Sequence, residues 1–427
     1  MRIINKPDRK DWPDLCGRPG IARTDLENTV RAIMDKIRSE GDTALMEYTR
    51  RFDGVSLTAL AVSDQERNAA VGRISMELQT AIRTAFENIH RFHLAQQPRE
   101  LVVETMPGVV CRRVPRPISP VGLYIPGGSA PLFSTVLMLG IPARIAGCED
   151  IVLCSPPQPD GTIHPAILFA AECCGIKTIF KCGGAQAIAA MSIGTETIPA
   201  VNKIFGPGNQ FVTCAKQMAA MNGVAIDLPA GPSEVLVIAD ADADPAFIAA
   251  DLLSQAEHGA DSQVVLVTDS GHLPEQVLRE IRQQLEVLPR ADVATKALEN
   301  SLCVVTSSMQ ECIAFSNTYA PEHLIVNCTN AMDQLTGITN AGSVFIGPWT
   351  PESAGDYASG TNHTLPTGGY ARSSAGVSVD SFVRYMTVQE ITPNGLRKVG
   401  PVVETMAEAE SLLAHKQAVS IRLNKLL

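Results

Sequence analysis

Two Glu-His pairs occur in a chain that has 8 histidines among 427 residues. The first lies in DLLSQAEHGADSQ (251–263), where Gln255 and His258 are three residues apart. On a helix, such residues lie about 60° apart around the axis and about 4.5 Å apart along it, so both side chains face one point. An imidazole is a good zinc ligand, and a carboxamide oxygen can occupy a weaker position. The alternative is that His258 is a partly exposed histidine stabilised by the helix dipole.

Three further residues, Asp356, His363 and His415, add to this metal hypothesis. Asp356 and His363 lie in SAGDYASGTNH, a loop-like stretch rich in Gly and Ser, and His415 lies in AEAESLLAHKQAV near the end of the chain. A zinc ion held by two histidines, one aspartate and one weaker neutral ligand keeps room for a substrate. Taken alone, His415 also fits a surface histidine on a helix that is charged on one face.

A similar spacing joins His90 and His93 in ENIHRFHLAQ. Arg91 lies between them, and no nearby loop supplies a carboxylate. We therefore expect both histidines to lie on a solvated helix face rather than to bind a metal.

The second pair, Glu322 and His323, closes a predicted helix just before the apolar stretch LIVNC. Both side chains can project into one cleft from a helix end. A glutamate with a raised pKa can accept a proton from water, and a histidine can accept one from an alcohol. An exposed helix cap is the alternative interpretation.

Two glycine-rich turns indicate a ligand with phosphates. KIFGPGNQFVTCAK has the form strand, GPGN, helix, in which Gly206 and Gly208 allow close approach of a ligand to the backbone. The spacing differs from GxGxxG, and many tight turns share it. CGGAQAIAAM is a second turn of this kind, and two such turns together favour a dinucleotide over a packing role.

These residues must be positioned by α/β units, because short apolar strands alternate with helices from about residue 120 onwards. A second series begins at EVLVIAD (234–240). The predicted fold is α/β, with two Rossmann-like, incompletely doubly wound lobes. We divide the chain into a helical N-terminal segment packed on the second lobe, a first lobe, a second lobe and a C-terminal helical tail, at 1–118, 119–229, 230–374 and 375–427.

The composition excludes several classes of protein. A net charge of −10 disfavours nucleic acids and anionic membranes as partners. No apolar run is long enough to span a bilayer and the N-terminus lacks a signal core, so we expect a cytoplasmic protein. The 11 cysteines include no CxxC pair, which fits buried thiols. A nucleophilic cysteine, as in aldehyde-oxidising enzymes, is the alternative, but none lies in a Gly-rich polar loop.

The stretch IDLPAGPSEVLVIADADADPAFIAADLLSQAEH (226–258) resembles the histidinol dehydrogenase family. It combines the AGPSE turn with a helix that ends in SQAEH. VGLYIPGG, FGPGN, YAPEHL, GDYASGTNHTLPT and AHKQAV match further motifs of that family in the same order, so the resemblance covers nearly the whole chain.

This resemblance implies a zinc- and NAD-dependent enzyme that oxidises L-histidinol to L-histidine, the last step of histidine biosynthesis, through an enzyme-held L-histidinal and two sequential hydride transfers. It implies one zinc ion per subunit, NAD on the first lobe, and a homodimer in which the C-terminal tail completes the partner's site. Carried over motif by motif, the catalytic residues are Glu322 and His323. The implied zinc ligands are Gln255, His258, Asp356 and His415. Substrate contacts are implied for Ser233, Gln255, His258, His323, Asp356, His363, Glu410 and His415, and NAD contacts for Tyr124, Gln186 and Asn209.

The residues suit this chemistry, because histidinol offers an imidazole and an amine as metal ligands. The metal would mainly orient the substrate, while His323 accepts the alcohol proton and Glu322 activates water. Three other hypotheses remain: a dehydrogenase acting on another amino alcohol or a polyol, a zinc hydrolase, and a non-catalytic protein with a structural metal.

Overall fold

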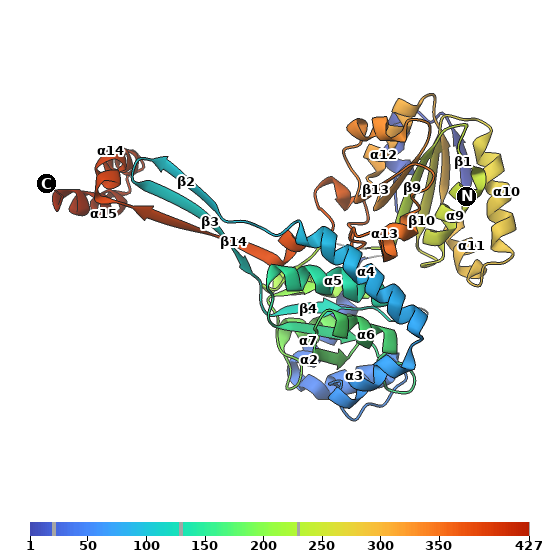
Figure 1. Cartoon of the computed structure of the whole chain (residues 1–427), viewed down its shortest axis with the longest axis horizontal. Helices are drawn as coiled ribbons and strands as arrows, with labels where there is room; N and C mark the ends of the chain where they lie inside the picture. Colours follow the sequence, from blue (N-terminus) through green and yellow to red (C-terminus); the bar gives the residue numbers. More distant parts are fainter. Residues whose placement is uncertain (19–22, 128–130, 229–230, 427) are drawn as a thin grey trace.

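The computed structural model describes the chain except residues 19–22, 128–130, 229–230 and 427. The predicted boundary between the two lobes, at 229 and 230, lies outside the described residues. Figure 1 shows two α/β lobes that face each other and a long arm that leaves them both.

The first lobe is built on a five-stranded parallel sheet of order β6-β5-β4-β7-β8. Val121 and Leu123 point into one core, whereas Tyr124 points into the core on the other face of the sheet. Its strands are β4 (Val121–Tyr124), β5 (Ile151–Ser155), β6 (Thr178–Lys181), β7 (Lys203–Phe205) and β8 (Ala225–Ile226), and its helices are α5 (Phe133–Ala146), α6 (Pro165–Cys173), α7 (Gly184–Ile193) and α8 (Gln210–Met221).

The second lobe has the same strand order with one strand added, β1-β11-β10-β9-β12-β13. Val235 and Val237 face one core, and Leu236 and Ile238 face the other. Its strands are β1 (Arg2–Asn5), β9 (Glu234–Ala239), β10 (Gln263–Thr268), β11 (Leu302–Val305), β12 (His323–Asn327) and β13 (Ser343–Ile346), and its helices are α1 (Trp12–Leu15), α9 (Pro245–Ala256), α10 (Leu273–Leu285), α11 (Ala291–Glu299), α12 (Met309–Tyr319) and α13 (Glu352–Tyr357).

In each lobe the chain starts in the middle of the sheet, builds two strands to one side and then returns to the other. This is the doubly wound order without its last strand. The predicted α/β fold with two Rossmann-like, incompletely wound lobes is therefore confirmed.

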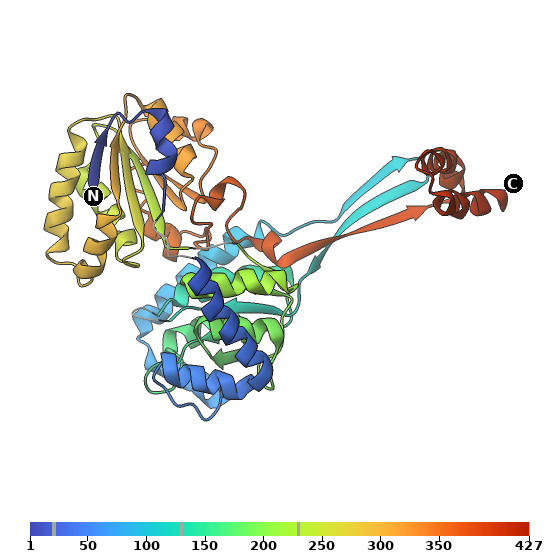
Figure 2. The ribbon, with the colours of Figure 1, turned by 180° about the vertical axis from the view of Figure 1, so that it is seen from behind.

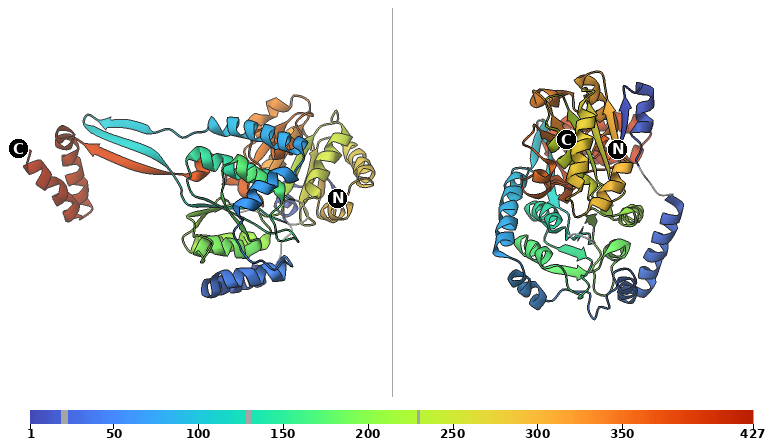
Figure 3. Two further views of the ribbon diagram at one scale, coloured as in Figure 1. Left: turned by 60° about the horizontal axis from the view of Figure 1, so that its bottom comes forward. Right: turned by 90° about the vertical axis from the view of Figure 1, so that its right-hand side faces the viewer.

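The N-terminal helices are α2 (Arg23–Phe52), α3 (Asp64–Ala70) and α4 (Met76–Leu94). They pack on helices of the first lobe, not on the second lobe as the sequence predicts. In Figure 3, α2 and α4 flank the first lobe on opposite sides. Val30 and Ile37 of α2 enter one of its cores, and Ile82 of α4 enters the other. The prediction is wrong here because an amphipathic face shows that a helix is half buried without showing which sheet covers it.

The arm consists of β2 (Leu101–Met106), β3 (Val109–Pro117), β14 (Val383–Ile391), α14 (Pro393–Ala409) and α15 (Leu413–Asn424). β14 pairs antiparallel with the whole of β3. Figures 1 and 2 show the three strands projecting from the lobes, with α14 and α15 at the far end. The predicted 1–118 and 375–427 segments are therefore not simply helical, since both supply strands to the arm. None of the described helices is long and apolar enough to cross a bilayer.

Candidate active site

The candidate acid–base pair lies at the amino edge of the second sheet. His323 is the first residue of β12 and pairs in register with Val235 of β9. The sequence predicts that Glu322 and His323 close a helix, but α12 already ends at Tyr319. The helix stops early because Ala320 adopts a left-handed conformation with φ of 53°. The pair is therefore carried by a loop and a strand start.

The ring of His323 is held between acceptors. Its Nδ1 lies 3.1 Å from the backbone oxygen of Glu234 and 3.7 Å from Oε2 of Glu322. Its Nε2 lies 3.2 Å from Oδ1 of Asp356. Since a carbonyl oxygen can only accept, Nδ1 carries a hydrogen in this arrangement. Nε2 is then the nitrogen that can gain or lose a proton.

Burial and charge shift the proton affinities of these groups in different directions. Burial raises the pKa of Glu322 to about 8. Burial opposes a charge on His323, but the carboxylates of Glu322 and Asp356 outweigh it and raise the pKa of His323 to about 10. Burial likewise acts against the Asp356 carboxylate, but the hydrogen bond and charge of His323 prevail and lower the pKa of Asp356. Such opposed shifts in one cluster are typical of a catalytic site.

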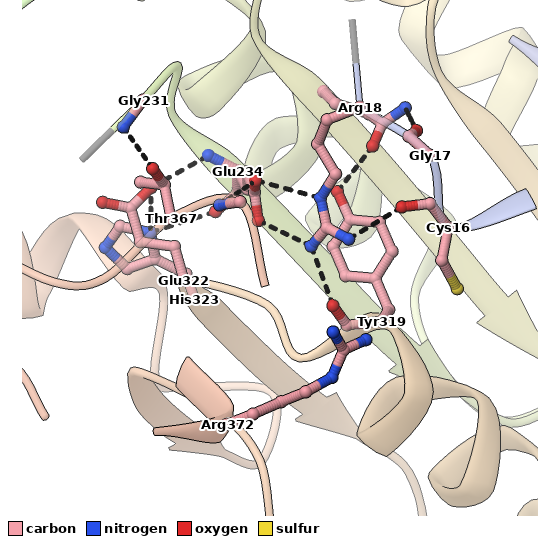
Figure 4. Close-up of polar contacts among 12 residues, drawn as sticks. Cys16, Gly17, Arg18, Gly231, Glu234, Tyr319, Glu322, His323, Thr367 and Arg372 are labelled. Atoms are coloured by element: carbon pink, nitrogen blue, oxygen red, sulfur yellow. Dashed lines mark hydrogen bonds and ion pairs between the residues drawn. The ribbon is translucent and has the colours of Figure 1, made fainter. Parts of the chain in front are cut away.

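A second layer of contacts, drawn in Figure 4, holds this pair through Glu234. The backbone N–H of Glu234 donates to Oε2 of Glu322 over 2.9 Å. The Glu234 carboxylate, 2% exposed, accepts two hydrogen bonds from Arg18, at 3.1 and 2.9 Å, and one from the N–H of Gly368 at 2.6 Å. The guanidinium of Arg18 also lies over the ring of Tyr319 at 3.6 Å. A segment before the first lobe thus fixes the backbone that holds the acid–base pair.

Gln255, His258 and Asp356 converge near this pair. Gln255 lies in the last turn of α9, is 1% exposed, and its Oε1 accepts no hydrogen bond from any described residue. His258 follows in the turn after α9, close enough to Asp356 for their charges to interact. An unpartnered amide oxygen, an imidazole and a carboxylate are a donor set that suits zinc. The described part of the chain has no group of three His, Cys, Asp or Glu side chains arranged to hold a metal, because the third donor here is an amide.

The sequence interpretation misses Glu352. It lies on α13 one helical turn before Asp356 and is 1% exposed. Its Oε1 accepts from Oγ of Ser254 at 2.9 Å, whereas its Oε2 has no partner among the described residues. Burial raises the pKa of Glu352 to about 7. The i, i+4 spacing of the two acids in PESAGD is a signal that could have identified it.

His363 joins the second lobe to the first. Its Nε2 lies 3.1 Å from Oγ1 of Thr135 in α5, and its Nδ1 donates to the backbone oxygen of Asp356 over 2.7 Å. The neighbouring Asn362 contacts Nε2 of His93 at 3.3 Å. The prediction that His93 lies on a solvated face is wrong, since its ring is fully buried. It packs there because the loop that carries His363 folds back onto α4.

The remaining predicted residues are divided between the site and the arm. Ser233 directly precedes β9, beside Glu234. Glu410 and His415 are exposed at the far end of the arm. Figure 1 shows α15 separated from both sheets by the length of the strands β2, β3 and β14. One chain therefore does not bring Glu410 or His415 to the other site residues.

The three predicted NAD contacts line one pocket of 1090 Å³ on the first lobe. Tyr124 ends β4, and its hydroxyl accepts the N–H of Gly184 at 3.0 Å. Gln186 lies on α7, and Asn209 caps α8 by accepting two backbone N–H groups at 3.1 Å. The pocket lies at the carboxyl edge of the sheet, beside the reversal of strand order between β4 and β7, where α/β proteins usually bind ligands.

The GPGN turn is fixed at the edge of this pocket. Gly206 has a φ of 129°, and a Cβ there would lie 2.1 Å from the backbone oxygen of Tyr124, so only glycine fits. Its N–H donates to Asp227 over 2.8 Å and its oxygen accepts from Lys216 over 2.9 Å. Lys216 and Asp227 form a buried ion pair behind the turn. The turn is therefore held rigidly beside the start of α8.

The alternative of a nucleophilic cysteine finds no support. All 11 cysteines are free thiols. Burial raises the pKa of Cys303 and Cys312 to about 12, and that of Cys148 and Cys328 to about 11. A thiol that resists ionisation is a poor nucleophile.

Comparison with known proteins gives consistent results. A family model described as histidinol dehydrogenase matches residues 17–423. Histidinol dehydrogenases of Bacteroides thetaiotaomicron and Bacteroides fragilis are 56% and 54% identical to this chain, each over 426 residues and the full length of both proteins. The crystal structure of histidinol dehydrogenase from Elizabethkingia anophelis superimposes with a TM-score of 0.96 at 55% identity, covering 100% of this chain and 98% of that one.

Proposed function

This chain belongs to the histidinol dehydrogenase family and is an oxidoreductase, and we propose that it oxidises L-histidinol to L-histidine with NAD and one zinc ion per subunit. The reaction would complete histidine biosynthesis through an enzyme-held L-histidinal and two hydride transfers. The carrying observation is the buried cluster of Glu322, His323 and Asp356, beside the helix that borders the dinucleotide pocket. A cytoplasmic location is part of the proposal, because eleven free thiols suit a reducing compartment.

In the first step, Nε2 of His323 accepts the hydroxyl proton of the alcohol while a hydride passes to NAD. Water then adds to the aldehyde, and the ionised carboxylate of Glu322 accepts a proton from that water. The resulting hydrate loses a second hydride to a second NAD and becomes the carboxylate. The raised pKa of Glu322, about 8, supports its role because it makes the ionised carboxylate a stronger base. Burial of both residues supports exclusion of bulk water.

Gln255, His258 and Asp356 would hold the zinc ion, and the unpartnered oxygen of Gln255 supports this assignment. When bound, the ion would orient the imidazole and amine of the substrate, and its charge beside Asp356 would lower the proton affinity of His323. Ser233 and His363 border the same space and would contact the substrate.

We infer a homodimer with shared sites, in which Glu410 and His415 reach the partner's lobes. Exposed apolar side chains cover the arm and support a partner surface there. They include Leu101, Val102, Val103, Met386, Val388, Ile391, Val402, Met406, Leu412, Leu413 and Ile421, each at least 36% exposed. α15 has no buried residue of its own, which also fits a helix that packs on another chain.

An assay with L-histidinol, NAD and zinc tests the proposed reaction directly. We expect two NADH per histidine formed, and no turnover with other amino alcohols or polyols. No NADH from histidinol would refute the proposal. Asn209→Ala should weaken NAD binding while zinc is retained. Turnover that is independent of NAD would instead favour the zinc hydrolase.

Subunit complementation tests the shared site. Glu322→Gln and His415→Ala should each be inactive, but their co-expression should restore about a quarter of the wild-type activity. Half of the dimers are then mixed, and each mixed dimer has one intact site. Co-expression of Glu322→Gln with His258→Asn is the matched control. It should restore nothing, because both residues come from the same lobe. Equal behaviour of the two mixtures would contradict a shared site.

A further inference from the structure

Asp53 is a carboxylate in an unfavourable position. It directly follows α2, whose C-terminal end repels a negative charge. Its Oδ2 is buried and accepts no hydrogen bond from any described residue. Burial raises the pKa of Asp53 to about 6. An ionised group in such a place is disfavoured unless a ligand supplies hydrogen-bond donors.

The surroundings of Asp53 indicate what that ligand is. Asp53 lines the same 1090 Å³ pocket as Tyr124, Gln186 and Asn209. The kink at Gly41, with φ of 54° and ψ of −131°, directs the second half of α2 towards this pocket. Rings and prolines dominate the wall near Asp53, and they suit the flat apolar faces of a base. The wall near Asp53 is formed by Tyr48, Phe52, Pro156, Pro157 and Pro159.

The charges around the pocket separate the parts of a dinucleotide. The diphosphate is favoured at the GPGN turn and the N-terminus of α8, a 12-residue helix capped by Asn209. A carboxylate repels phosphate, so Asp53 faces a part of the ligand that carries donors. Arg51 also lines the pocket, but its guanidinium lies over the Phe52 ring at 5.3 Å. A ribose diol offers two O–H groups side by side, which match the two oxygens of one carboxylate.

We propose that Asp53 accepts hydrogen bonds from a ribose diol of the bound dinucleotide. On the adenosine ribose, the same contact would exclude a 2′-phosphate and select NAD over NADP. This inference rests on the proposed NAD-dependent function, and it adds a specificity residue that lies outside the acid–base and metal cluster.

The test is the affinity of Asp53→Asn for NAD, measured by titration calorimetry on the full-length zinc-loaded protein. The amide keeps the size of the side chain but loses the charge. We expect the dissociation constant for NAD to rise by about 10- to 100-fold, the range for one lost hydrogen bond to a charged group. Asp35→Asn is the matched control on the same helix. Asp35 is exposed and pairs with Arg38, so its replacement should leave NAD affinity within about twofold.

Smaller nucleotides assign the ribose. If Asp53 contacts the adenosine ribose, the variant loses affinity for AMP but not for 2′-deoxy-AMP, and it discriminates less against NADP. If it contacts the other ribose, only nicotinamide mononucleotide is affected. The inference is overturned if Asp53→Asn binds NAD as wild type does, or if neither mononucleotide is weakened. A wild-type protein that fails to bind NAD would refute the proposed function instead. Circular dichroism and zinc content verify that the variant is folded.

Discussion

Replacing Arg18 by Gln should disturb the site without touching any residue that meets the substrate. Arg18 is the cation paired with Glu234, whose side chain is 2% exposed. Glu234 holds Glu322 through its N–H and His323 through its backbone oxygen. Loss of Arg18 leaves a buried carboxylate with the N–H of Gly368 as a remaining donor. The backbone that fixes the acid–base pair should then shift.

The size of the effect follows from the burial of the pair. Removing one partner of a buried ion pair costs about 3–5 kcal/mol. Arg18 is 17% exposed and Gly368 still contributes one hydrogen bond, so we expect the lower end, about 3 kcal/mol. That loss lowers the midpoint of thermal unfolding of the second lobe by roughly 6–12 °C. A displacement of the catalytic groups by a fraction of an ångström should lower kcat at least about tenfold.

Differential scanning calorimetry and steady-state kinetics measure the two effects. The double variant Arg18→Gln/Glu234→Gln should recover about 2 kcal/mol, since it removes the buried charge as well. Arg9→Gln is the control, because Arg9 forms a 4.0 Å surface pair with Glu311 and is 70% exposed. It should change stability by less than about 0.5 kcal/mol. The reasoning fails if Arg18→Gln unfolds within 2 °C of wild type at unchanged kcat, or if the double variant is no more stable than the single one.

Glu322→Gln should lower kcat by about 10²- to 10⁴-fold at unchanged zinc content, as expected for loss of a general base, and rapid kinetics with unchanged turnover would contradict its role. His258→Asn should lose zinc while circular dichroism stays unchanged, and stoichiometric metal in the variant would remove His258 from the ligand set. Removing residues after Val402 should abolish activity and dimerisation together, whereas an active monomer by light scattering would exclude the shared site. Burial raises the pKa of Asp251 to about 7 from 3.8, so the folded protein takes up a proton below pH 7. Stability should therefore fall as pH rises from 4 to 7, by at most about 4 kcal/mol, and Asp251→Asn should flatten this dependence in urea unfolding, while parallel profiles for both proteins would refute it.

Local patterns in the sequence predict much of the fold. The alternation of apolar strands and helices predicts two parallel α/β lobes because hydrophobic periodicity depends on neighbours along the chain. The spacing of Gln255 and His258 predicts a shared direction because both lie on one helix. The GPGN turn likewise predicts a ligand loop, since Gly206 must adopt a backbone conformation that other residues avoid.

Tertiary structure alone decides which distant segments meet. β3 pairs with β14 across more than 250 residues, and no local pattern specifies that register. The same holds for Arg18 against Glu234 and for Asp53 at the pocket, because a side chain's partner depends on the packing of whole elements rather than on adjacent residues. The arm shows this most clearly. Its strands carry His415 away from the lobes of its own chain, so the meeting of motifs within one sequence is decided by the geometry of packed elements and, in our proposal, by a second subunit.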